Sequence, residues 1–175
     1  MHVMLDLETM GIHGQSPIIA IGAVVFDETG VYEKFYTQVQ LESNLSVGLR
    51  PDASTILWWL EQSDNARGAF RNNEIAPTLS EALSNFAEWF HDVGGEQVWG
   101  NGAVSDNGIL GNAYRAVGIA QPWKFWNDRC YRTIKSLYPH MTLERVGTHH
   151  NALDDAESQA RHLSKIALEH GFALQ

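Results

Sequence analysis

The first eleven residues constrain the fold more than any other stretch of the chain. Apolar side chains alternate with other residues there, which is the period of a half-buried β-strand: Val3, Leu5 and Leu7. Asp6 and Glu8 therefore share the opposite face of that strand, about 7 Å apart. Two carboxylates this close repel each other unless a hard cation or a shared proton neutralises them. Residues 9–11 end the strand, so the acidic pair lies at its carboxyl end, where α/β sheets place their ligands.

The length of 175 residues predicts one domain, over residues 1–175, with a sizeable core. Hydrophobic residues make up 44% and charged residues 19%, as in ordinary globular proteins. No apolar run approaches the ~20 residues that a membrane helix needs. Asp6 and Glu8 interrupt the stretch where a signal peptide would have its apolar core. Cys130 is the only cysteine, which excludes an intrachain disulfide. We therefore expect a cytoplasmic protein without a membrane partner.

The net charge of −9 argues against broad electrostatic binding to duplex nucleic acid. It still allows an enzyme that grips one or two terminal nucleotides. Part of the negative charge would then belong to metal ligands, which cations neutralise when they bind.

Three strands are expected before the first helix. Pro17 precedes a nearly continuous apolar run over residues 18–26, which is typical of a strand buried on both faces. Residues 27–30 form a turn pattern, and the β-rich run over 31–39 then returns beside the previous strand. Together with the first strand, this order predicts a β-meander.

Helices dominate the rest of the chain. Thr78 to Glu81 is a capping box, and the apolar spacing behind it, which runs to Phe90, predicts a helix that ends before Gly94 and Gly95. Residues 97–99 predict a short strand, so the architecture is mixed α/β. The remaining expectations are an irregular stretch over 40–52, a short helix capped by Asp52 or Ser54, a helix after the loop 100–107 that stops at Gly118, a short strand or connector over 122–126, a helix from Asp128 to Leu137, and a last helix from Asn151 or Ala152 to Gly171.

Further acidic residues fall at the ends of these elements. Asp106 follows the loop after the late strand, and Asp155 lies in the first turns of the last helix, with His150 just ahead of it. In a mixed sheet such strand ends and helix starts can meet at one edge, beside Asp6 and Glu8. Carboxylates and one imidazole in a single cleft describe a two-metal site for phosphoryl transfer. Oxygen ligands suit Mg²⁺ or Mn²⁺.

Three motifs carry a resemblance to a known family: Asp6-Leu7-Glu8, Asn101 with Asp106, and His150-Asn151-Ala152-Leu153-Asp154-Asp155. In this order they resemble the exonuclease motifs of the DnaQ-like (DEDDh) 3′–5′ exonucleases. The third motif is the most informative, because the family has His, then Ala two residues on and Asp five residues on. The chain looks closest to small phage-type exonucleases and to a compact group of poly(A)-directed exoribonucleases. It departs from the family at Ser105, where an aromatic residue is usual; Ser105 is a candidate helix N-cap instead.

The resemblance implies an RNase H-like α/β fold, with a five-stranded mixed sheet and helices on its faces. It also implies two ions, Mg²⁺ or Mn²⁺, with Asp6 bridging them. Glu8 and Asp155 would complete the shell of one ion, and Asp106 would support the second. His150 would take a proton from the attacking water, because histidine titrates near neutrality.

The implied substrate is the 3′ end of single-stranded RNA or DNA, shortened with release of nucleoside 5′-monophosphates. RNA is slightly favoured, although no residue pattern identifies a partner for a 2′-hydroxyl group. Backbone groups at Thr9, Met10 and Gly11 would hold the 3′-terminal nucleotide. Many relatives of this type are homodimers, and the sequence is compatible with a homodimer.

Several polar and aromatic residues leave alternatives open. Neighbouring helix positions point about 100° apart, so one of Trp58 and Trp59 can pack in the core while the other faces the cleft. An indole in the cleft would stack on a base, worth ~1–3 kcal/mol, but core packing is the simpler interpretation. Asn101 either orients a ligand or only turns the chain. His149 is out of register with the family pattern and is expected on the loop surface, and Asp154 is expected to be a helix-start charge.

Two other hypotheses compete with the exonuclease. A catalytically idle nucleic-acid or nucleotide-binding module on the same fold would have lost a ligand or the histidine, yet all these positions are present. A nuclease that cuts internally is disfavoured by the histidine of the third motif, and a circular substrate would distinguish it.

Overall fold

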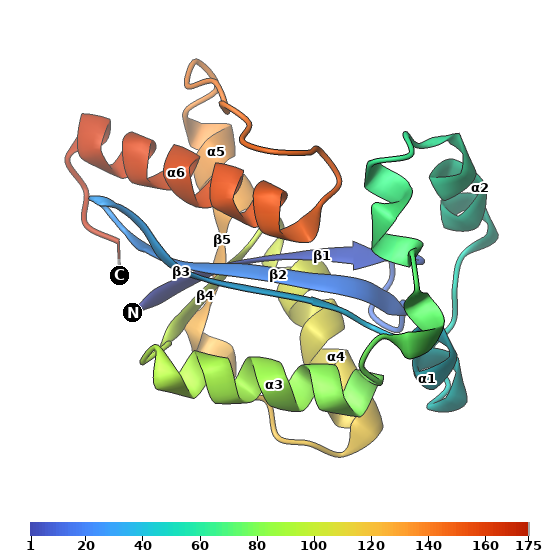
Figure 1. The fold of residues 1–175 in the computed structure, drawn as a ribbon. Helices are drawn as coiled ribbons and strands as arrows, with labels where there is room; N and C mark the ends of the chain where they lie inside the picture. Colours follow the sequence, from blue (N-terminus) through green and yellow to red (C-terminus); the bar gives the residue numbers. More distant parts are fainter. Residues whose placement is uncertain (175) are drawn as a thin grey trace.

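A mixed five-stranded sheet forms the centre of the protein, in the order β3-β2-β1-β4-β5 (Figure 1). The computed structural model describes residues 1–174. β1 pairs antiparallel with β2, and β2 with β3, whereas β1, β4 and β5 run parallel. The predicted meander and mixed sheet are confirmed. The strands are β1 His2–Thr9, β2 Ile18–Asp27, β3 Gly30–Gln38, β4 Gln97–Gly100 and β5 Asp128–Cys130.

Helices cover both faces of the sheet (Figure 1). They are α1 Leu41–Ser46, α2 Ala53–Glu61, α3 Leu79–Asp92, α4 Gly108–Val117, α5 Tyr131–Leu137 and α6 Ala152–His170. α3 and α4 lie on one face, α5 and α6 on the other, and α2 lies beyond the carboxyl end of β1. Within residues 1–174, no helix combines the length and the apolar content needed to cross a membrane.

The side chains of β1 alternate between two faces, as predicted, but both faces are buried against a core. One core, under α3 and α4, contains the apolar side chains Val3, Leu5 and Leu7. The other core, under α6, contains Met4. Since Asp6 and Glu8 share the face of Met4, both point toward the side of the sheet that α6 covers.

Local capping explains where the longer helices begin and end. Thr78 and Glu81 form the predicted capping box at α3. The side chain of Asn151 accepts hydrogen bonds from the amides of the first turn of α6. Gly118 and Gly171 end α4 and α6 in the left-handed conformation, which glycine adopts without steric cost.

Several local predictions were wrong. The last strand, β5, lies where a helix was expected to begin at Asp128, whereas residues 122–126 are a connector, which was one of the two expected alternatives. Asp128 does not cap α5, because its Oδ1 accepts hydrogen bonds from the side chains of Asn107 and Trp123. A short helix, α1, lies inside the stretch expected to be irregular. Asp52 precedes α2, but its carboxylate accepts from the amide of Ile12 rather than capping the helix. Ser105 is no N-cap, since it lies within a π-helical turn, Ala103–Asn107, that runs into α4.

Candidate functional site

A glycine in β2 lets α6 come close to the sheet. Gly22 is the cross-strand partner of Asp6. A Cβ atom at Gly22 would overlap the carbonyl carbon of Ala152 and the amide nitrogen of Leu153. Only glycine therefore allows the first turn of α6 to lie directly on β2. This packing carries Asp155, in the same turn, to the carboxyl end of β1.

Three carboxylates meet there. Ligand atoms of Asp6, Glu8 and Asp155 all lie within 4.8 Å of one another. Only 6% of Glu8 and 8% of Asp155 is exposed. Burial, with the charges of Asp155 and Asp106, raises the pKa of Glu8 to about 8. Burial also raises the pKa of Asp6 well above its usual range, and the charge of Asp106 adds to that rise. The cluster therefore concentrates negative charge that only protons or cations can offset.

Asp106 lies at the edge of this cluster. It is the largest neighbouring charge acting on Asp6, but it is outside the group within 4.8 Å among the described residues. Burial raises the pKa of Asp106 to about 6, while a backbone hydrogen bond from Asn101 and the charge of Arg132 limit the rise. The structure thus brings all the predicted acidic residues to one site, with Asp106 at its edge, outside the group formed by Asp6, Glu8 and Asp155.

His150 reaches the site through its backbone as well as its ring. Its φ angle is 65°, in the left-handed region that few non-glycine residues adopt. In this conformation its amide donates to Asp155 Oδ2 at 2.9 Å. Atoms of His149, His150 and Asp155 also lie within 4.8 Å of one another. Burial, and then the charge of His149, lowers the pKa of His150. The third motif therefore folds into a turn that ties the histidine to a carboxylate.

Aromatic rings hold the imidazole of His150. The ring centroid of Trp58 lies 4.9 Å from that of His150, with the ring planes at 90°, and the ring of His149 stacks on His150 at 3.7 Å and 25°. Trp59 is only 4% exposed, and its indole donates to the carbonyl of Thr9 at 2.9 Å, whereas Trp58 is 39% exposed. One tryptophan thus packs in the core while its neighbour remains partly exposed, as the helix geometry predicted.

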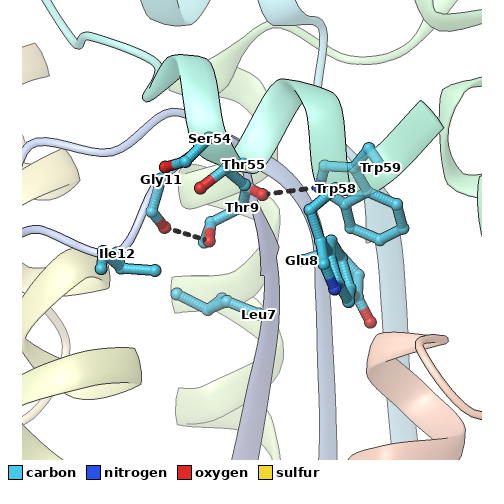
Figure 2. Close-up of a pocket in the computed structure, with 9 residues that line it drawn as sticks. All are labelled: Leu7, Glu8, Thr9, Gly11, Ile12, Ser54, Thr55, Trp58 and Trp59. Carbon is cyan, nitrogen blue, oxygen red and sulfur yellow. Dashed lines mark hydrogen bonds between the residues drawn. The ribbon is translucent and has the colours of Figure 1, made fainter. Parts of the chain in front are cut away.

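A pocket of about 430 Å³ lies between β1 and α2 (Figure 2). Thr9 and Gly11 line it, and Thr9 Oγ1 donates to the carbonyl of Gly11. Met10 lies outside this lining and is buried; its amide bonds to Pro17, and its carbonyl accepts from Asp52. The residues that line the pocket are Leu7, Glu8, Thr9, Gly11, Ile12, Ser54, Thr55, Trp58 and Trp59.

Asn101 lies on the other side of the acidic cluster. It follows β4, and its Oδ1 accepts from Arg132 Nε at 3.5 Å. Together with Arg132 it lines a separate cavity. The structure therefore places Asn101 beside Asp106 and outside the pocket that contains Trp58.

The acidic residues fit hard divalent cations. Every carboxylate oxygen in the cluster is a ligand of the kind that Mg²⁺ and Mn²⁺ prefer. Glu8 Oε1 is buried and has no hydrogen-bond partner among the described residues. A buried acceptor without a donor is costly, so this atom marks a place for a cation.

Two contacts at the site escaped the sequence analysis. Gln159 Nε2 donates to Asp6 Oδ1 at 2.7 Å, and Arg145 Nη1 donates to Asp155 Oδ1 at 2.5 Å. Gln159 follows Asp155 by four residues on α6, so helical spacing could have identified it. Nothing in the sequence distinguishes Arg145, which comes from the long segment between α5 and α6.

Comparisons with known proteins agree with this geometry. Residues 1–167 match the family model of the Rv2179c-like 3′–5′ exoribonuclease domain. An exodeoxyribonuclease of Enterobacteria phage T4 is 26% identical, over 74% of this chain and 68% of the phage protein.

Solved structures show the same fold. The nuclease domain of 3′hExo, a DEDDh family member bound to rAMP, superposes with a TM-score of 0.67 at 15% identity, over 99% of this chain and 94% of that chain. Exonuclease X, in complex with 5′ overhanging duplex DNA, superposes with a TM-score of 0.61 at 15% identity, over 99% and 95% of the two chains. The predicted DnaQ-like resemblance and RNase H-like fold are confirmed.

Proposed function

The chain belongs to the family of Rv2179c-like 3′–5′ exoribonuclease domains, and from this membership we propose its substrate and mechanism. It is a 3′–5′ exonuclease of the DEDDh type. The proposed reaction releases nucleoside 5′-monophosphates from the 3′ end of single-stranded RNA, with DNA as the slower substrate. The observation that carries the proposal is the cluster of Asp6, Glu8 and Asp155, with ligand atoms within 4.8 Å of one another, beside His150.

RNA is favoured by the description of the matching family, which is an exoribonuclease domain. The phage relative is an exodeoxyribonuclease, which supports DNA as a second substrate. The pocket between β1 and α2 would receive the terminal nucleoside. Trp58 offers a partly exposed ring there, and Thr9 and Gly11 bring polar backbone and hydroxyl groups to the same pocket.

DEDDh exonucleases depend on divalent metals, and the residues present fit them. Asp6, Glu8 and Asp155 would hold one Mg²⁺ or Mn²⁺, and Asp106 with Asp6 the second. When bound, two such ions supply the positive charge that stabilises the attacking and leaving oxygens of a phosphodiester.

His150 is the proposed general base. An imidazole titrates near neutrality and can accept the proton of an attacking water. The hydrogen bond from its backbone amide to Asp155, together with the rings of Trp58 and His149, holds His150 at the edge of the acidic cluster. The base is therefore oriented by packing and by its own backbone.

The test uses 5′-labelled single-stranded RNA and DNA of one sequence, incubated with Mg²⁺, Mn²⁺ or EDTA. We expect a ladder of shortening products that needs metal, forms faster on RNA, and disappears in the Asp155→Asn and His150→Ala variants. Folded wild-type protein that binds RNA but leaves both substrates intact with both metals would contradict the proposal and favour an idle binding module. Cleavage of a circular strand would favour an internal nuclease.

A homodimer and a cytoplasmic location remain predictions from the sequence. Light scattering on the purified protein would test the first, and fractionation of the source cells the second.

A further inference from the structure

Positive charge is concentrated in one part of this acidic chain. The net charge is −9, yet residues 115–135 carry five of the 12 basic residues and a single acidic one, Asp128. The basic residues of this segment are Arg115, Lys124, Arg129, Arg132 and Lys135.

Two of these side chains line a cavity of about 520 Å³ on α5. Arg132 and Lys135 are three residues apart on the helix, so they share one of its faces. Asn101, from the loop after β4, lines the same cavity and accepts a hydrogen bond from Arg132 Nε. Among residues 1–174, neither basic side chain has a carboxylate oxygen within 4 Å, whereas Lys34, Arg145 and Arg161 all do.

This cavity borders the acidic cluster. The guanidinium of Arg132 lies against Gly102, where a Cβ atom would be 3.4 Å from Arg132 Cζ. Gly102 has a φ angle of 120°, which other residues rarely adopt, so the loop 101–107 depends on a glycine there. The charge of Arg132 also acts on Asp106. The cavity is therefore adjacent to the Asp106 end of the site.

The order of groups across the site gives this end a role. Asp155 contacts His150 on one side and belongs to the cluster with Asp6 and Glu8 on the other, while Asp106 lies beyond them. In phosphoryl transfer the attacking and leaving oxygens are roughly in line, on opposite sides of the phosphorus. With His150 serving the attacking water in the proposed function, the leaving 3′-oxygen would lie on the side of Asp106. The rest of the strand begins at that oxygen.

We propose that Arg132 and Lys135 form a phosphate subsite for the strand just upstream of the scissile bond. This inference rests on the proposed exonuclease function. A guanidinium binds phosphate with paired, charge-assisted hydrogen bonds, and an ammonium adds a point charge. The two ends of the cluster thus divide the substrate: the terminal nucleoside enters the pocket beside Trp58, and the upstream backbone enters the basic cavity.

The test compares two substrates. The p-nitrophenyl ester of thymidine 5′-monophosphate contains the terminal nucleotide but no upstream phosphate, whereas a single-stranded oligonucleotide contains both. For Arg132→Gln with Lys135→Gln, we expect kcat/KM on the oligonucleotide to fall about tenfold or more, with the ester within about twofold of wild type. On the oligonucleotide, the slope of log kcat/KM against log salt should become shallower by about 0.7 for each phosphate that the variant no longer neutralises.

Matched variants separate binding from loss of structure. Lys135→Gln alone leaves the hydrogen bond between Arg132 and Asn101 intact and should still weaken the oligonucleotide reaction. Lys165→Gln removes the same charge at an exposed site paired with Glu144 and should behave like wild type. An equal fall on ester and oligonucleotide, or an unchanged salt slope, would overturn the proposal. A wild type inactive on both substrates would remove the exonuclease premise, and the proposal with it, before any variant is compared.

Discussion

Asp6 and Glu8 lie on a central strand that pairs with β2 on one side and β4 on the other, whereas His150 lies between α5 and α6 in a segment without helix or strand. The strand fixes its carboxylates before any ligand arrives, although their charges repel each other. The position of the histidine depends on a left-handed backbone conformation, one hydrogen bond from its backbone amide and the rings around it.

This difference separates stability from activity. Removing a carboxylate from the strand relieves repulsion in a buried place, so it should affect stability as well as catalysis. Changing the histidine or its ring contacts alters a surface segment, so the effect should fall mainly on catalysis. Variants in each region, and one far from both, test this contrast.

The largest effect is expected for Asp6→Asn. Losing the carboxylate at the centre of the cluster should lower kcat by about 10³-fold or more, because metal binding and charge stabilisation both suffer. In EDTA at alkaline pH, where the cluster is ionised, the same variant should melt at a higher temperature than wild type, since a repelled, buried charge is gone. Thermal melts with and without Mn²⁺ check this. A lower Tm in EDTA would show that the cluster is not strained by repulsion.

His150→Ala should lower kcat by about 10²–10⁴-fold, the usual contribution of a general base. Its Tm in EDTA should stay close to that of wild type, and Mn²⁺ should still raise that Tm because the carboxylates remain. Calorimetry and single-turnover rates measure the two properties. Loss of the Mn²⁺-induced Tm rise would mean that the histidine segment also builds the metal site.

Trp58 touches both halves of the site, so it sharpens the comparison. Trp58→Ala should lower kcat/KM by about tenfold, since an aromatic ring contributes ~1–3 kcal/mol to stacking on a base and also supports His150. Trp58→Phe should restore most of the activity. If phenylalanine restores KM but not kcat, any aromatic ring is sufficient to bind the nucleotide, whereas the indole is needed to orient His150.

The pH dependence of stability should reveal the buried acid. The pKa of Glu8 is raised from 4.5 to about 8, so the folded state holds this proton more tightly than the unfolded chain. Folding then takes up a proton, and without metal stability should fall as pH rises from about 4.5 to 8. In thermal melts with EDTA, the Tm of Glu8→Gln relative to that of wild type should rise by several degrees as the pH increases across this range. A constant Tm difference would contradict a buried, protonated Glu8.

The smallest effect is expected far from both halves. Thr78→Ala removes the capping box of α3, which should cost about 1 kcal/mol and lower the Tm by about 2–4 °C. Its kcat/KM should equal that of wild type at 25 °C. A loss of activity in this variant would mean that a change at α3 alters β1, and that the strand carrying Asp6 and Glu8 is less rigid than its pairing implies.

Features that depend on neighbouring residues could be predicted from the sequence alone. Strand period two assigned Val3 to one face of the sheet and Asp6 to the other, and capping chemistry located the start of α3. The predicted spacing of His150 and Asp155 brings them together in the structure because His150 lies in the turn just before α6 and Asp155 lies in the first turn of that helix. Such patterns act over a few residues, so the chain carries them locally.

Contacts between side chains that are distant in the sequence could not be predicted in this way and are seen only in the folded chain. Gly22 looks like any small residue in an apolar run, yet the close approach of α6 to β2 depends on it. Gln159, Arg145 and the packing of Trp58 on His150 follow from that approach and from the path of the segment between α5 and α6. The physical reason is that such contacts depend on how two elements pack together, which no periodicity within either element encodes.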